Sequence, residues 1–92
     1  MPAGVDAARG YVESEFKTSV QMSTHPEGFF PVLSFQSEGR SFSVNISTEF
    51  DQDCDAGAID GYRFLIEHDL AGKLRSSKNG KAAVRTGGIA PL

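Results

Sequence analysis

The chain has 92 residues, of which 39% are hydrophobic and 23% charged, and its net charge is −3. This length excludes two independent cores, and this apolar content excludes a disordered chain, so we expect one globular unit. One cysteine excludes an intrachain disulfide framework and favours a reducing, cytoplasmic location, while the absence of a long apolar run argues against a signal peptide or a membrane partner.

The first expected element is an amphipathic helix over residues 5–17. Apolar side chains recur there at the spacing of one helix face, at Val5, Ala8, Val12 and Phe16. Asp6 is the expected N-cap, because a short carboxylate side chain can accept a hydrogen bond from an early backbone N–H group. This helix supplies one wall of the predicted core.

An antiparallel β-hairpin with strands at about 29–37 and 40–50 is the clearest pattern. Apolar and polar residues alternate in both runs, around a two-residue loop at Glu38-Gly39. This loop predicts three cross-strand pairs on the apolar face: Phe35 with Phe42, Leu33 with Val44, and Pro31 with Ile46. Pro31 has no backbone donor, which favours an edge position for the first strand.

The opposite face of this hairpin is polar, with an apolar pair at its start. Phe30 and Val32 lie among serine and amide side chains, so they need either a covering element or a partner. The candidate interaction surface therefore consists of Phe30, Val32, Ser34 and Asn45. The unpaired edge of the hairpin is a second place where another chain can bind.

Carboxylates recur at every second position just after the hairpin. Asp51, Asp53 and Asp55 are candidate ligands for a divalent cation, since hard cations prefer several carboxylate oxygens. The residues that follow do not match an EF-hand loop. The simpler interpretation is an acidic loop that ends a strand and begins a helix, with its carboxylates near the positive helix terminus.

Residues 58–71 fit two periodicities. A helix places the apolar residues Ile59, Tyr62, Ile66 and Leu70 on one face, whereas a strand fits the alternation that begins at Tyr62. The length of the segment between a cap at Asp55 and a stop at Gly72 favours a second helix, with a third strand as the alternative.

Residues 73–92 contain five basic side chains and no acidic ones, and they have few large apolar groups. We expect a flexible basic tail, separate from a small α+β domain at 1–72. The dipeptide Asn79-Gly80 is a hairpin signal, but its flanks are too weakly apolar to support one. The basic residues are Lys73, Arg75, Lys78, Lys81 and Arg85.

The expected fold is thus α+β: an N-terminal helix, a hairpin, a second helix or third strand, and a basic tail. The sequence places no nucleophile, base and orienting group together, so we expect neither an enzyme nor a cofactor. The leading hypothesis is a protein-interaction or regulatory module that self-associates as a homodimer. The alternatives are binding of an acidic partner, or less readily of nucleic acid, through the tail, and binding of a divalent cation at the acidic loop.

Overall fold

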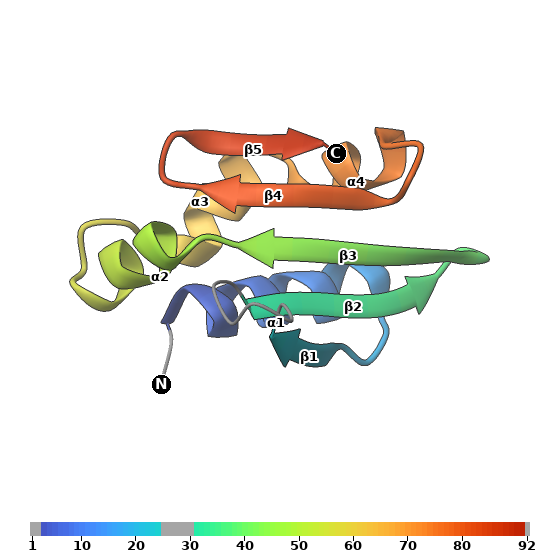
Figure 1. Cartoon of the computed structure of the whole chain (residues 1–92), viewed down its shortest axis with the longest axis horizontal. Helices are drawn as coiled ribbons and strands as arrows, with labels where there is room; N and C mark the ends of the chain where they lie inside the picture. Colours follow the sequence, from blue (N-terminus) through green and yellow to red (C-terminus); the bar gives the residue numbers. More distant parts are fainter. Residues whose placement is uncertain (1–2, 25–30, 92) are drawn as a thin grey trace.

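The computed structural model describes residues 3–24 and 31–91, which form a mixed α+β fold (Figure 1). Within these ranges the helices and strands follow one another in this order: α1 (Ala3–Phe16), β1 (Gln21–Thr24), β2 (Pro31–Ser37), β3 (Arg40–Ile46), α2 (Thr48–Asp55), α3 (Gly61–Glu67), α4 (Leu70–Ser76), β4 (Lys81–Arg85) and β5 (Gly88–Pro91).

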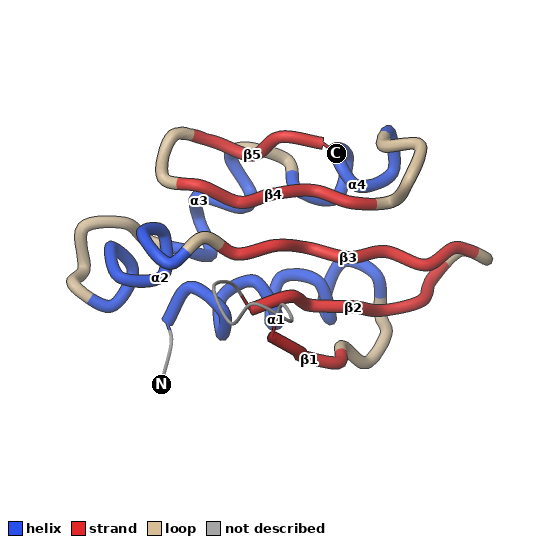
Figure 2. Tube along the Cα trace, viewed as in Figure 1, coloured by secondary structure: helices blue, strands red, loops and turns tan. Residues whose placement is uncertain are grey.

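The five described strands form one sheet in the order β1-β2-β3-β4-β5. Neighbouring strands are antiparallel except for β3 and β4, which are parallel. Antiparallel neighbours can be joined by short turns, but a parallel pair needs a long crossover. Helices α2, α3 and α4 make up that crossover, and β4 returns beside β3 (Figure 2).

The helices α1, α3 and α4 lie behind the sheet in Figure 1, and α2 lies beyond one end of β3. Helix α1 contacts β2, and α4 contacts β4 and β5. Burial agrees with this arrangement, because Phe42, Val44 and Ile46 on β3 are buried while the residues between them are partly exposed. One face of the sheet therefore carries the core, and the opposite face has no described element over it.

The predicted hairpin is confirmed as β2 and β3. Leu33 pairs with Val44 and Phe35 with Phe42, as the two-residue loop requires. Glu38 and Gly39 have φ values of 57° and 73°, and positive φ at both central positions is typical of a type I′ turn. The second strand ends at Ile46 rather than near residue 50 because Ser47 caps α2 there.

The expected edge position of the first hairpin strand is wrong. Strand β2 lies between β1 and β3, and Thr24 pairs with Pro31. The sheet tolerates Pro31 because this residue is the first of its strand, where a missing backbone donor costs little. Phe30 lies outside the described residues.

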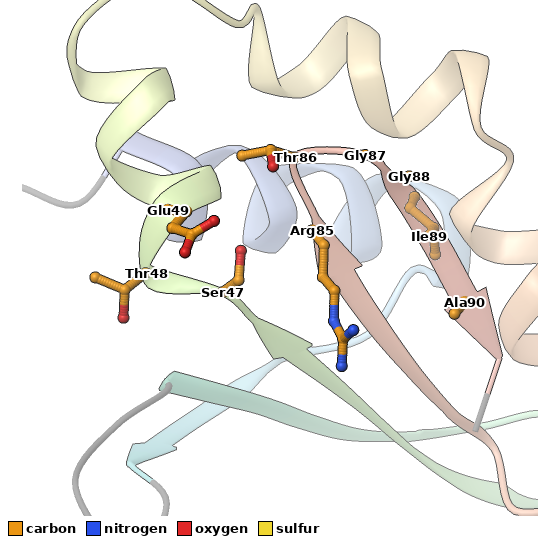
Figure 3. A pocket seen from close by; sticks show the side chains of 9 residues that line it. All are labelled: Ser47, Thr48, Glu49, Arg85, Thr86, Gly87, Gly88, Ile89 and Ala90. Atoms are coloured by element: carbon orange, nitrogen blue, oxygen red, sulfur yellow. The ribbon is translucent and has the colours of Figure 1, made fainter.

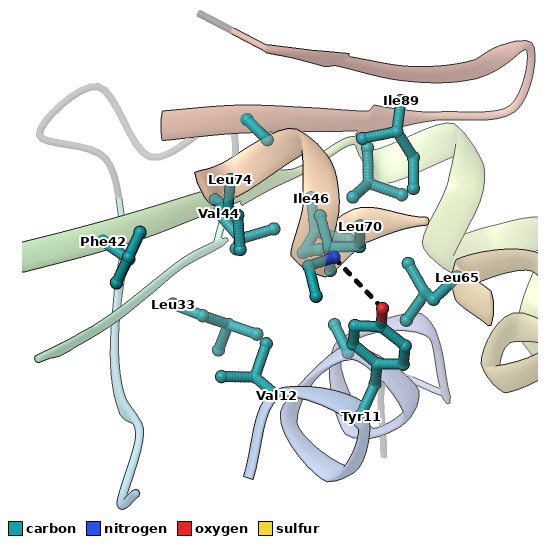
Figure 4. Packing of buried hydrophobic residues seen from close by; sticks show 14 of the residues in the cluster. Tyr11, Val12, Leu33, Phe42, Val44, Ile46, Leu65, Leu70, Leu74 and Ile89 are labelled. Atoms are coloured by element: carbon teal, nitrogen blue, oxygen red, sulfur yellow. Dashed lines mark hydrogen bonds between the residues drawn. The ribbon is translucent and has the colours of Figure 1, made fainter. Parts of the chain in front are cut away.

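The core joins the covered face of the sheet to the helices (Figure 4). Val5, Ala8, Val12 and Phe16 are all buried, which confirms the predicted apolar face of α1. The ring of Phe16 packs against Phe35 and Phe42, with ring centroids 4.9 and 5.2 Å away.

The segment 58–71 contains helix and no strand, as the length of the pattern indicated, but its helical residues belong to two helices: α3 covers 61–67, and α4 begins at residue 70. Asp69 has a φ of 52°, which is a left-handed conformation. This residue interrupts the helical path after α3, and α4 begins after it in a new direction. The caps are Asp60 and Asp69 instead of Asp55. Gly72 lies inside α4 and does not stop it.

Residues 73–91, the described part of the expected flexible tail, are ordered elements instead, since they contain the end of α4 and both strands of the β4–β5 hairpin. The sheet includes strands from both sides of residue 72, so no structural boundary falls there. Gly80 has a φ of 65° but connects α4 to β4, and the hairpin turn lies at Thr86-Gly87. Among the described residues, none of the helices is long and apolar enough to cross a membrane.

Candidate functional site

The carboxylates predicted to bind a cation lie on helix α2 rather than on a loop. Asp51 Oδ1 accepts hydrogen bonds from the backbone N–H groups of Gly4 and Val5, at 2.8 and 3.2 Å. Asp55 Oδ1 accepts one from Ala3 N at 2.9 Å. Together these two side chains satisfy the first N–H groups of α1, which otherwise have no partner within the helix.

The helical conformation also separates the three carboxylates. Successive residues of a helix are rotated by about 100°, so Asp51 and Asp53 point in nearly opposite directions, whereas Asp51 and Asp55 share a side. In the described part of the chain, no group of three or more His, Cys, Asp or Glu side chains has an arrangement that could hold a metal ion. The expectation that these carboxylates lie near the start of the helix that follows them is wrong, because Asp51 and Asp55 lie within α2 and accept hydrogen bonds at the start of α1 instead. Asp6 lies in the first turn of α1, but α2 supplies the hydrogen-bond acceptors.

The basic residues of the expected tail divide into two groups. Lys73 Nζ donates to His68 O at 2.6 Å. Arg75 donates to both carboxylate oxygens of Glu38 and lies over the Phe16 ring, with its guanidinium carbon 4.5 Å from the ring centroid. These two cations therefore connect parts of the fold.

The other three basic residues, Lys78, Lys81 and Arg85, are exposed, and none makes an ion pair with another described residue. Lys78 lies in the loop after α4. Lys81 and Arg85 lie on β4, four residues apart, and alternation places both on the face of the sheet opposite the helices.

Three residues of the predicted interaction surface, Val32, Ser34 and Asn45, lie on this same face, which we call the open sheet face, and the fourth, Phe30, lies outside the described residues. Val32 and Asn45 are paired across β2 and β3, and Ser34 lies beside Ser43. The side chains of Val32, Ser34, Ser43 and Asn45 are all partly exposed. The structure thus brings two sets of residues together that the sequence placed apart, because β4 pairs with β3 and carries its cations alongside the serines.

A second surface was not predicted and lies on α3. Tyr62 and Ile66 are 42% and 55% exposed, and they are the large hydrophobic side chains that the described residues leave exposed. The periodicity assigned both to the core, but Leu65 and the partly buried Phe64 take that role. Tyr62 and Ile66 were assigned to the core because the predicted helix face also included Leu70. The break at Asp69 places Leu70 in α4, so it does not belong to the apolar pattern of α3.

Two groups in the helix layer have perturbed acidity. Burial, and then the nearby Asp51 carboxylate, raises the pKa of the Cys54 thiol, so the reactive thiolate is disfavoured. Burial also raises the pKa of Tyr11, whose hydroxyl accepts a hydrogen bond from Ala71 N at 3.1 Å (Figure 4). Both shifts favour the neutral form.

Comparisons with known proteins found no family model, no curated protein and no solved structure that matches this chain.

Proposed function

We propose that this protein is a non-enzymatic interaction module that self-associates through α3. The observation that carries the proposal is the exposure of Tyr62 and Ile66, one helical turn apart, on a domain whose other large apolar side chains, where described, are buried or partly buried. Positions four residues apart lie on one side of a helix, so the two side chains form a continuous apolar stripe. A stripe of this kind is stabilised when another apolar surface covers it.

Helix α3 is held firmly enough to present this stripe. Gly61 lies so close to α1 that an added Cβ would be 2.9 Å from Ala7 Cβ, which indicates tight packing of the two helices. The ring of Tyr62 meets Tyr11 edge-on, with centroids 6.1 Å apart. The exposed side of Tyr62 is therefore fixed in orientation, which lowers the entropic cost of binding a partner.

The charges beside the stripe favour a second copy of the chain. Arg63 and Glu67 form an exposed pair along α3, with Nε and Oε1 2.8 Å apart. When two copies of α3 pack antiparallel about a twofold axis, a residue near the start of one helix contacts a residue near the end of the other, and the reverse contact forms as well. Such packing brings Tyr62 against Ile66 and Arg63 against Glu67 of the other copy, so one surface supplies both halves of the interface.

The association we propose is weak. Helix α3 spans seven residues, or about 10 Å, and a stable interface buries at least about 1,200 Å² in total. A reversible, concentration-dependent dimer fits this surface better than an obligate one. The free thiol of Cys54 fits a reducing location such as the cytoplasm.

Light scattering after size exclusion, at two protein concentrations and two salt concentrations, tests the proposal. We expect the wild type to shift from monomer toward dimer as concentration rises, and Tyr62→Ser and Ile66→Ser each to remain monomeric. Val32→Ser is the matched control, because it removes a partly exposed apolar side chain from the open sheet face.

Charge reversal provides an independent check. Arg63→Glu should weaken the dimer by placing like charges together, and the combined variant Arg63→Glu with Glu67→Arg should restore it. A wild type that stays monomeric at high concentration would contradict the proposal. So would a dimer lost in Val32→Ser but retained in Ile66→Ser.

A further inference from the structure

The open sheet face carries positive charge and no negative charge from its strands. The five described strands contain no aspartate or glutamate. Lys81 and Arg85 project from β4 on this face, although the chain as a whole has a net charge of −3. The acidic side chains of the described ranges lie in helices and loops instead.

Four polar side chains lie next to one another across the sheet. Gln21 pairs with Ser34, Ser34 with Ser43, and Ser43 with Lys81, which takes one residue from each of four neighbouring strands. Strands are spaced by about 4.8 Å, so this polar row extends over about 14 Å. Lys81 stands at its end as the charged member.

A shallow pocket of about 680 Å³ lies over this polar row. All four residues of the row line it, and apart from Phe35 and Phe42 every other lining residue is polar and uncharged. Hydroxyl and amide groups can donate hydrogen bonds to an oxyanion, and Lys81 adds a charge-assisted one. The pocket therefore suits a carboxylate, with donors on the floor and a cation at the side.

A second pocket, of about 670 Å³, lies at the other end of β4 and contains Arg85 (Figure 3). Figure 3 shows Arg85 and Glu49 on opposite sides of this pocket, so a bound anion there meets one cation and one carboxylate. Lys81 and Arg85 are four residues apart on a strand, which is about 13 Å. Lys81 is the stronger of the two anion sites, because its pocket contains no carboxylate.

The aromatic residues point away from this face. Phe35 and Phe42 are the aromatics of the described strands, and both are buried under the helices. Sequence-tolerant binding of single-stranded nucleic acid depends on bases that stack on exposed aromatic rings. Two or three cations without such rings give only weak, nonspecific attraction to phosphates. An acidic protein segment suits the face better than a nucleic acid does.

We propose that the open sheet face binds an extended, acidic segment of a partner protein, with one carboxylate seated at Lys81 in the polar row. An extended segment matches the length of β4, so that a second carboxylate about four residues along reaches Arg85. This site is on the opposite side of the sheet from α3, and it does not depend on self-association.

Titration with a peptide of alternating glutamate and serine, followed by the backbone NMR signals of the full chain, tests this assignment. We expect saturable shifts at Ser34, Ser43 and Lys81, and none with the peptide in which glutamine replaces every glutamate. Binding should weaken as salt rises.

Matched variants locate the contact. Lys81→Gln should weaken the acidic peptide about two- to fivefold, the range for a solvent-exposed ion pair. Lys78→Gln makes the same charge change outside the pocket and should leave affinity unchanged. The monomeric Tyr62→Ser variant should bind as well as the wild type, which separates this proposal from dimer formation.

Three results would overturn it: no saturable binding of the acidic peptide, equal binding of the glutamine peptide, or equal weakening by Lys78→Gln and Lys81→Gln. Tighter binding of a single-stranded oligonucleotide than of the acidic peptide, mapped to the same residues, would also overturn it in favour of a phosphate ligand.

Discussion

The two faces of the sheet are built from the same strands but differ in the side chains that dominate them. The covered face contributes phenylalanine, leucine, valine and isoleucine to one core, and each of these side chains in β2 and β3 is buried. The open face presents serine, asparagine and glutamine with two cations. Because side chains alternate along a strand, one segment can supply stability on one side and a binding surface on the other.

The largest expected difference lies between neighbours on β2 that point to opposite faces. Leu33→Ala should lower the free energy of unfolding by about 2–5 kcal/mol, because it leaves a cavity in the core. Ser34→Ala should change it by less than about 0.5 kcal/mol. Chemical denaturation measures both.

If Leu33→Ala and Ser34→Ala lowered the free energy of unfolding by similar amounts, the proposed difference between the two faces would be wrong. If Leu33→Ala does not fold, Ile46→Val removes a single methylene from the same face and should still cost about 0.5–1.5 kcal/mol. Asn45→Ala is then its partner on the open face.

An intermediate effect is expected within the helix layer. Asp51→Ala should cost about 0.5–2 kcal/mol, because the first N–H groups of α1 lose their acceptor. Asp51→Asn should retain part of this contribution, since an amide oxygen still accepts. Asp53→Ala removes the same charge from the other side of α2, and thermal denaturation should show it close to the wild type.

The smallest effect is expected at the ion pair between Glu38 in the hairpin turn and Arg75 of α4, whose Oε2 and Nη2 atoms are 2.8 Å apart. The hydrogen bond from Arg75 lowers the pKa of Glu38, so the pair stabilises the fold above the ordinary glutamate pKa. This contribution is lost as the pH falls through the lowered pKa of the folded state.

Glu38→Gln should therefore lower the denaturation midpoint slightly at neutral pH, by less than Asp51→Ala, and the difference from the wild type should vanish in acid. Both side chains of the pair are close to half exposed, so solvent screening keeps the effect small. Glu13→Gln is the charge-matched control on an exposed helix position. A difference that grows toward acid pH would contradict this account.

Local patterns predicted the hairpin and α1, because each depends on residues close together in sequence. Leu33, Phe35 and their partners follow a period of two around a turn, and the apolar face of α1 follows the helical period. The register of β2 with β3 was correct for the same reason.

The sequence-based predictions that were wrong concern features that a regular helix or strand periodicity does not reveal. The left-handed residue Asp69 resets the helical phase, so Tyr62 and Ile66 were assigned to the core. Strand β4 was missed because its covered-face residues are small, apart from Val84, and because its neighbour β3 lies beyond three helices. The turn at Thr86-Gly87 was the local signal that could have revealed it.

The open sheet face was predicted only in part for the same reason. The polar residues of the hairpin were identified, and so were the basic residues after residue 72. Their meeting depends on the parallel pairing of β3 with β4, which no local pattern encodes.

That parallel pairing also sets the order in which the molecule can fold. The hairpin of β2 and β3 closes locally, and so does the hairpin of β4 and β5, but the two meet only after residues 47–80 have crossed over the sheet. Until then β3 is an unprotected edge with a row of unpaired backbone groups. We expect the docking of β4 to be the slow step, so a nascent chain is most prone to aggregate just before that step.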